Sequence, residues 1–188
     1  MKKIIWNVEY LGLPLVVKHC PKCGGKARFY CSEKFRVNAH KKELDIWLIY
    51  KCCGCDATWN ARVYSQIPPQ TIKLGRLEKF YNNDAELVKE YAMDLGFLYK
   101  NGAEKAELPW YTISGENFLP DEKVRLIIKN SFALPVKAAS VIKRKLQLTQ
   151  AEYLQMLDSG KIKSVPQQDL RKYRLKDEVI IVFNCGVC

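Results

Sequence analysis

The sequence predicts an α+β fold: an N-terminal zinc-ribbon β-sheet, a helical middle region, and a C-terminal helix pair with short strands. Three observations support this class. Two Cys-x-x-Cys pairs flank alternating apolar segments, a capped helical pattern follows a proline pair, and two helical patterns precede a β-branched run. We therefore expect a ribbon domain over 1–66, a helical and irregular connecting region over 67–122, and a basic domain over 123–188.

The composition is that of a globular protein. Of the 188 residues, 48 % are hydrophobic and 27 % are charged, which excludes a disordered or collagen-like chain. No apolar run approaches the roughly 18 residues that a membrane span requires. The first residues faintly resemble a signal peptide, but Asn7 and Glu9 interrupt the apolar stretch. We expect a cytoplasmic protein that does not associate with membranes.

Six of the eight cysteines form Cys-x-x-Cys pairs: Cys20/Cys23, Cys52/Cys55 and Cys185/Cys188. In the first pair, Pro21 fixes one φ angle and Gly24 can take a positive φ, as in a metal knuckle, and Gly54 gives the second pair similar freedom. Two such knuckles complete a tetrahedral site of four thiolates. We expect Cys20, Cys23, Cys52 and Cys55 to hold one structural zinc ion.

Other readings of the cysteines stay open. A thioredoxin-like redox pair or a rubredoxin-like iron site has the same spacing, but no βαβ pattern surrounds either pair, which favours zinc. His19 can replace a cysteine ligand, and Cys53 can do the same or face solvent. Cys31 lies on an apolar strand face and is expected to be a buried thiol. The tail pair fits a frayed end, a disulfide or a metal site shared with a second copy.

The segments between and after the knuckles alternate with the period of a β-strand. Strands are predicted over 27–37, 44–50 and 57–63, with a polar turn over 38–43. Residues 4–10 also alternate, which predicts an N-terminal strand that packs on the ribbon or the middle region.

The middle region begins at Ile67-Pro68-Pro69, since consecutive prolines cannot continue a strand. A helix is predicted from 83–86 to Gly96, followed by an Asn101-Gly102 turn and irregular structure over 108–119. Asp121 and Glu122 follow a proline, as at a helix N-terminus, rather than forming an acid/base pair. No catalytic constellation is present, and the only reactive candidates are Cys53 and the tail pair, so we expect no enzymatic activity.

The C-terminal part contains two helical patterns. One covers 136–146, and the second starts at the capping box Thr149–Glu152 and ends at Gly160. Strand-like segments follow over 161–165 and 173–183.

Residues 134–183 resemble the αL RNA-binding module of ribosomal small-subunit proteins, pseudouridine synthases and tyrosyl-tRNA synthetases, most specifically over Thr149–Ile162 and Leu175–Ile180. Thr149-Gln150 stands where that module usually has Ser-Arg, and its Asn-Gly hairpin turn is missing. The whole chain also resembles the uncharacterised bacterial family called domain of unknown function 1062, most clearly at 19–23, 29–38 and 44–60. That second resemblance implies a fold and no activity.

Charge and motifs together predict RNA binding. The net charge of +11 divides into +7 over 1–66, −4 over 67–122 and +8 over 123–188. We expect structured RNA, ribosomal or transfer RNA, to contact the basic C-terminal part, with the ribosome or another protein as a further partner. The residues expected to contact phosphates are Lys143, Arg144, Lys145, Lys161, Lys163, Arg171, Lys172 and Arg174.

The ribbon offers a second basic surface, where Tyr30 is expected to stack on unpaired bases. Its cations are Lys22, Lys26, Arg28, Lys34 and Arg36. The alternative function is a zinc-ribbon adaptor that binds another protein and no nucleic acid.

Overall fold

The computed structural model describes residues 1–184 and confirms a mixed α+β fold, with two compact units that each contain one five-stranded sheet. Unit 1 consists of Met1–Leu11 and the chain from Trp110 onward; unit 2 is Gly12–Pro109. This division differs from the expected domains 1–66, 67–122 and 123–188, because the first strand pairs with residues 111–114 of the middle region and 124–129 of the C-terminal part. Unit 2 is thus an insertion in unit 1.

The sheet of unit 2 is antiparallel throughout, in the strand order β5-β4-β3-β2-β6. The strands predicted over 27–37, 44–50 and 57–63 are confirmed, and β2 and β6 add to them. The five strands are β2 (Leu15–Cys20), β3 (Gly25–His40), β4 (Glu43–Cys52), β5 (Thr58–Ile67) and β6 (Lys105–Glu107).

Short helices connect β5 to β6. The predicted helix start is confirmed, because the Asp84 side chain accepts a hydrogen bond from the Leu87 N–H at 2.9 Å. The predicted continuation to Gly96 is wrong: a second cap, in which Asp94 accepts from the Phe97 N–H at 3.0 Å, begins a new helix. The helices are η1 (Pro69–Thr71), α1 (Arg76–Tyr81), α2 (Ala85–Ala92) and α3 (Leu95–Lys100).

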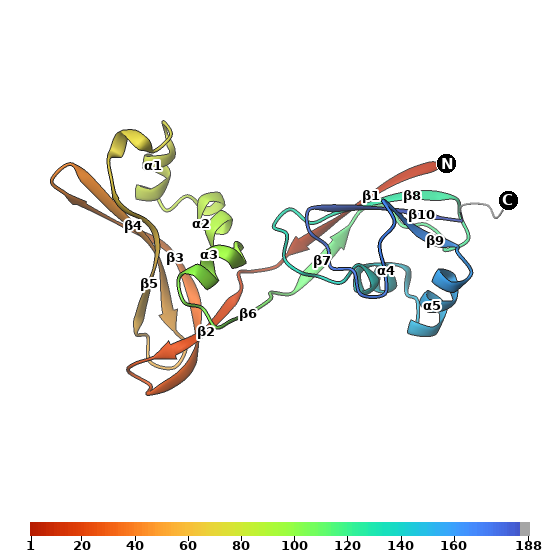
Figure 1. The fold of residues 1–188 in the computed structure, drawn as a ribbon, viewed down its shortest axis with the longest axis horizontal. Helices are drawn as coiled ribbons and strands as arrows, with labels where there is room; N and C mark the ends of the chain where they lie inside the picture. The colour runs from red at the N-terminus through yellow and green to blue at the C-terminus, as the bar shows by residue number, and fades with distance from the viewer. Residues whose placement is uncertain (185–188) are drawn as a thin grey trace. The chain divides into compact units, whose positions relative to one another are not determined.

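The helices of unit 2 cover one face of its sheet (Figure 1). Leu48 and Tyr50 from β4 are fully buried there against Val88 and Leu98 from α2 and α3. Residues at the intervening positions of the strands point to the opposite face, where most are exposed or half-buried.

The sheet of unit 1 has the order β7-β1-β8-β10-β9, and only β1 and β8 are parallel. The expectation that the N-terminal strand packs on the ribbon or the middle region is confirmed only for the middle region, since β1 pairs with β7 on one side and with β8 of the C-terminal part on the other. The irregular segment over 108–119 contains β7, and β8 rather than a helix follows Glu122. The strands are β1 (Lys2–Tyr10), β7 (Tyr111–Ser114), β8 (Val124–Lys129), β9 (Ile162–Val165) and β10 (Glu178–Phe183).

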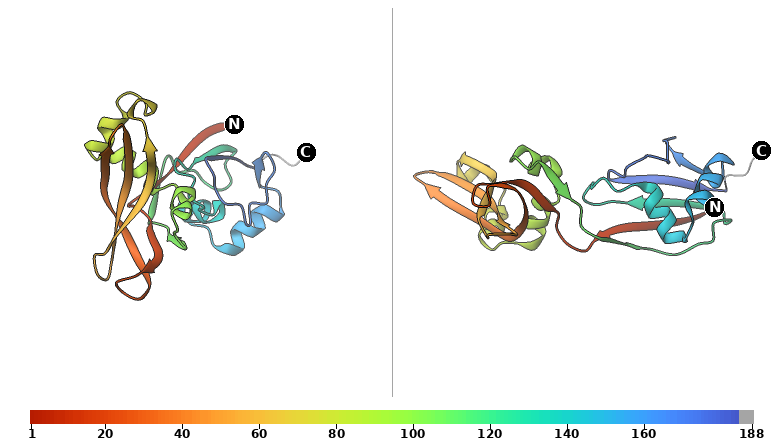
Figure 2. Two further views of the ribbon diagram at one scale, coloured as in Figure 1. Left: turned by 60° about the vertical axis from the view of Figure 1, so that its left-hand side comes forward. Right: turned by 90° about the horizontal axis from the view of Figure 1, so that it is seen from below.

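Two helices, α4 (Ala138–Leu146) and α5 (Gln150–Asp158), pack on one face of this sheet (Figure 2). The capping box is confirmed, because Thr149 accepts from the Glu152 N–H while the Glu152 carboxylate accepts from the Thr149 N–H. Gly160 ends α5 with φ +71°. No helix within residues 1–184 is long and apolar enough to cross a lipid bilayer.

Candidate metal centre

The two Cys-x-x-Cys knuckles of unit 2 are turns between neighbouring strands. The first joins β2 to β3 directly after Cys20, and the second joins β4 to β5 directly after Cys52. Because Phe29 of β3 pairs with Cys52 of β4, and Cys20 pairs with Gly25, both turns lie at the same end of the sheet. The antiparallel register therefore brings together cysteines that are about 30 residues apart in sequence.

The backbone of the two knuckles is equivalent. The Gly24 N–H donates to the Cys20 carbonyl at 3.0 Å, and the Asp56 N–H donates to the Cys52 carbonyl at 3.0 Å. Gly24 has φ +73° and Asp56 has φ +56°. The second turn therefore does not depend on the positive φ at Gly54 that the sequence predicts. Its left-handed residue is Asp56, and aspartate tolerates the left-handed helical region of backbone conformations.

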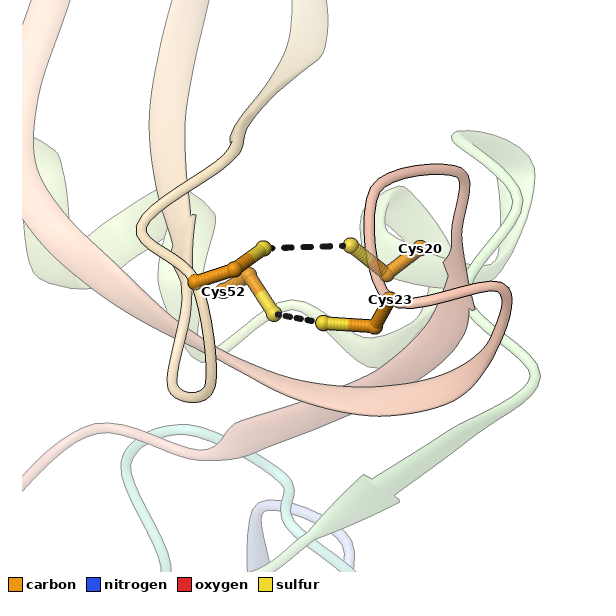
Figure 3. A group of neighbouring side chains, drawn as sticks. Cys20, Cys23 and Cys52 are labelled. Atoms are coloured by element: carbon orange, nitrogen blue, oxygen red, sulfur yellow. Dashed lines mark hydrogen bonds between the residues drawn. The ribbon is translucent and has the colours of Figure 1, made fainter.

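The four sulfur atoms converge. The Sγ atoms of Cys20, Cys23, Cys52 and Cys55 all lie within 4.8 Å of one another. Cys20 Sγ lies 3.6 Å from Cys55 Sγ, and Cys23 Sγ lies 3.8 Å from Cys52 Sγ, as the dashed lines in Figure 3 mark. A disulfide requires about 2.05 Å. Four sulfurs at about 2.3 Å from a central zinc ion are about 3.8 Å apart, so this donor set fits a tetrahedral thiophilic metal.

Burial and hydrogen bonding make the thiols chemically different. Cys20 and Cys52 are fully buried, whereas Cys23 is exposed. The Gly54 N–H hydrogen-bonds to Cys52 and lowers its pKa to about 7 by stabilising the thiolate. Hydrogen bonding to Cys55, Cys20 and Cys52 raises the pKa of the Cys23 thiol to about 12. The Cys23 thiol thus retains a proton that a bound cation would displace.

The remaining thiols and His19 lie outside this cluster within residues 1–184. Cys31 is buried in β3, and burial raises the pKa of its thiol to about 11, as expected for an unreactive core residue. Cys53 is exposed in the second knuckle, and His19 is exposed on β2. Cys185 and Cys188, the tail pair, lie outside the described residues.

The eight cations predicted to contact RNA all lie in unit 1, but at several places. Lys163 and Arg171 line one hollow of about 380 Å³, and Lys143 and Arg144 line another of about 360 Å³. Arg171 forms an ion pair with Asp158. Four others donate to neutral oxygens: Lys143 to Gln150 (2.7 Å), Arg144 to the Tyr111 carbonyl (2.9 Å), Lys145 to the Ile113 carbonyl (3.0 Å) and Arg174 to the Pro135 carbonyl (2.9 Å).

The last three of the eight differ in their surroundings. Lys172 forms an ion pair with Asp169 at 3.5 Å, whereas Lys161 and Lys163 are exposed at the start of β9. The cations therefore form separate basic spots rather than one patch of eight.

The ribbon cations also have local partners. Lys26 pairs with Glu104 at 2.6 Å, and Arg28 pairs with Glu107 at 3.1 Å. Lys22 lies in the first knuckle and Lys34 in the bulge of β3, both exposed. Arg36 lies over the ring of Trp47, 6.0 Å from its centroid.

Sequence reasoning missed three residues beside this ribbon surface, namely Trp47, Lys51 and Arg62. The alternation of β4 carried the signal: Leu48 and Tyr50 face the helices, so Trp47 and Lys51 face the other way.

A family model described as "Protein of unknown function (DUF1062)" matches residues 37–168, more than half of the chain. The match covers the second knuckle but begins after the first, so the resemblance seen over 19–23 lies outside it. No curated protein and no solved structure matches the chain. The chain, with its four-cysteine cluster, belongs to the DUF1062 family.

Proposed function

We propose that Cys20, Cys23, Cys52 and Cys55 bind one structural zinc ion, and that the protein is an RNA-binding protein rather than an enzyme. The observation that supports the zinc site is the convergence of four Sγ atoms within 4.8 Å from two equivalent knuckles. Four thiolates leave no open coordination position for water or substrate, which favours a structural role. Free thiolates require a reducing compartment, so the proposal places the protein in the cytoplasm.

Elemental analysis of the purified protein tests the zinc site. We expect one zinc per chain, lost in Cys20→Ser and in Cys52→Ser. Cys31→Ser and Cys53→Ser are matched controls, because both thiols lie in the same unit and outside the cluster. Iron with visible absorbance, or zinc that survives Cys52→Ser, would contradict the assignment.

The charge of both units supports RNA binding. Unit 2 contains 16 basic and 11 acidic side chains, a net charge of +5, and unit 1 contains 15 and 9, a net charge of +6. The acidic segment 67–122 therefore does not form an acidic unit, because its residues are divided between two basic ones. A net positive field attracts polyanions to both units.

Four of the C-terminal cations are ordered by hydrogen bonds that do not neutralise their charge. Lys143, Arg144, Lys145 and Arg174 each donate to an uncharged oxygen, which orders the side chain and leaves its charge available. Such cations lose little further side-chain entropy on meeting a phosphate. The resemblance of residues 134–183 to the αL module, with the order α4, α5, β9, β10, adds ribosomal or transfer RNA as the expected class.

An electrophoretic mobility shift against total RNA across a salt series tests RNA binding. We expect binding at low salt whose affinity falls steeply as salt rises, because phosphate contacts release counterions. The charge variant Lys143→Gln/Arg144→Gln/Lys145→Gln should reduce both affinity and salt dependence. Absent or salt-insensitive binding would contradict the proposal.

A protein-interaction adaptor is the second candidate, and a row of apolar residues on unit 1 favours it. Ile5, Ile127, Ile180 and Val165 are consecutive partners across β1, β8, β10 and β9. Ile5 is 40 % and Val165 is 49 % exposed. Crosslinking to ribosomal proteins that survives ribonuclease treatment and is lost in Val165→Lys would favour the adaptor.

A further inference from the structure

The sheet of unit 2 has one face that its own helices leave uncovered. Leu48, Tyr50 and Ala61 point toward α2 and α3 and are fully buried. The intervening positions of β3, β4 and β5 form the opposite face, and no helix of residues 12–109 packs on them (Figure 1). We call this the open face.

An aromatic ring lies between two arginines at the centre of the open face. Trp47 of β4 pairs directly with Arg36 of β3 on one side and with Arg62 of β5 on the other. Directly paired residues of antiparallel strands project from the same face, so the three side chains form one row across the sheet. Trp47 is half-buried, and the Arg36 guanidinium lies 6.0 Å from its ring centroid.

A second aromatic ring lies further along the same face. Tyr30 of β3 is 40 % exposed and pairs with Lys51 of β4, whose Nζ donates to the Thr58 hydroxyl at 2.8 Å. The Tyr30 hydroxyl donates to Asp56 at 3.2 Å, which orders the ring. Four residues along a strand and one strand across place the two rings about 14 Å apart. This separation accommodates a few nucleotides of an extended chain.

The open face is basic as well as aromatic. Six cations and three carboxylates lie on it, and these residues are Lys26, Arg28, Arg36, Lys51, Arg62 and Lys105, with Glu43, Asp45 and Glu107. Among residues 1–184, no carboxylate lies within ion-pair distance of Arg36, Lys51 or Arg62. Three of the four open-face cations without a carboxylate partner are thus the ones beside the two rings, and the fourth is Lys105 on β6.

We propose that a single-stranded segment of RNA binds across the open face, with bases stacked on Trp47 and Tyr30 and phosphates held by Arg36, Lys51 and Arg62. The inference rests on the proposed RNA-binding function and assigns it a surface and a substrate form. Bases of a duplex are already stacked, whereas unpaired bases present the flat faces that aromatic rings bind. An acidic peptide would match the charge but would leave both rings without a planar partner.

Fluorescence anisotropy with a labelled 12-mer of oligouridine and the full-length zinc-loaded protein tests this surface. We expect Trp47→Ala to weaken binding about tenfold, because a stacked base contributes that much affinity, and Trp47→Phe to retain most of it. Tyr99→Ala, an exposed aromatic on α3 of the same unit, is the matched control and should bind as the wild type does. Arg62→Gln should weaken binding and lower the salt dependence, whereas Lys100→Gln should do neither. Circular dichroism and zinc content establish that each variant is folded.

The outcomes separate the surface from the function. Wild-type binding that is lost in Lys143→Gln/Arg144→Gln/Lys145→Gln but unchanged in Trp47→Ala and Tyr30→Ala would overturn the open-face site and leave RNA binding in place. No wild-type binding to any RNA would overturn both. A duplex or polyglutamate whose affinity falls in Trp47→Ala as much as that of oligouridine would overturn the single-strand assignment.

Discussion

Each of the two units contains one five-stranded sheet, but the buried residues that stabilise the two sheets are of different kinds. Unit 1 relies on an apolar layer in which Trp6, Leu126 and Ile128 are fully buried. Unit 2 places two thiols, Cys20 and Cys52, among its fully buried core residues at the end of the sheet where the knuckles meet. Every cysteine within residues 1–184 belongs to unit 2. We therefore expect loss of the proposed metal to destabilise unit 2 alone, and truncation of the apolar core of unit 1 to destabilise unit 1 alone.

The largest expected effect is that of removing the proposed zinc ion. Structural zinc contributes about 10 kcal/mol of apparent folding free energy, which is comparable to the whole stability of a small domain, so chelation should unfold unit 2 and leave unit 1 folded. Hydrogen exchange resolved by peptide measures both units at once, and Cys53→Ser is the control, since it changes an exposed thiol of the same knuckle. Equal loss of protection in both units would contradict the separation.

Truncation of the unit 1 core should have the converse effect. Trp6 is fully buried, stacks on Phe118 with centroids 5.4 Å apart, and donates from Nε1 to the Glu116 carbonyl at 2.8 Å. Trp6→Ala should cost about 3–5 kcal/mol of unfolding free energy in unit 1. Urea denaturation followed by circular dichroism measures the loss, and the metal content should not change. Metal loss in this variant would show that the units depend on each other.

Substitution of a glycine beside Trp6 should also destabilise unit 1, through a clash with the backbone rather than through a cavity. Gly115 has φ +114°, and a Cβ there would lie 2.2 Å from the Ile5 carbonyl oxygen, which belongs to the β1 backbone and cannot easily move. Gly115→Ala should therefore destabilise unit 1 by at least about 2 kcal/mol in a thermal melt. Gly12→Ala, where no atom lies within 4 Å of the added carbon, should be nearly neutral. Equal melting temperatures of the two variants would refute the steric argument.

The smallest effect concerns the capping box of α5. Thr149→Ala removes the hydrogen bond to the Glu152 N–H and should cost unit 1 about 1 kcal/mol, whereas Gln155→Ala on the same helix should not. Hydrogen bonds from the Thr149 N–H and hydroxyl lower the pKa of Glu152 below its usual 4.5. Its contribution is thus complete above pH 4.5 and is lost as pH falls through the lowered pKa. Glu152→Gln should therefore lose stability less steeply than the wild type below pH 4.5. Equal pH dependence of the two proteins would contradict a contribution from the Glu152 carboxylate.

Local signals in the sequence predicted most of unit 2. Alternation identified the three long strands, and the Cys-x-x-Cys spacing identified the knuckles, because each pattern is set by residues close in sequence. The register that brings Cys20 next to Cys55 follows from joining those hairpins. The apolar pattern did not reveal the second helix cap at Asp94, which divides the one predicted helix into α2 and α3.

Unit 1 was harder to predict because its central pairing is non-local. Ile4 of β1 pairs with Leu126 of β8 in a parallel register, and nothing near either residue specifies the partner. The four-residue strand β7 lies between Pro109 and Gly115, residues that usually indicate irregular structure, and forms an edge where only one side needs a partner. The helix pair was predicted, since the apolar spacing of α4 and the capping box of α5 are both local signals.

The insertion of unit 2 between β1 and β7 has a consequence for synthesis on the ribosome. Every residue of unit 2 emerges from the ribosome before β7, β8 or β10 emerges, so unit 2 can fold, and bind the proposed zinc ion, first. The strand β1, with Trp6 and Ile4, must meanwhile stay unpaired for about 100 residues of elongation. We expect the unpaired β1 segment to be the part of the nascent chain that chaperones bind.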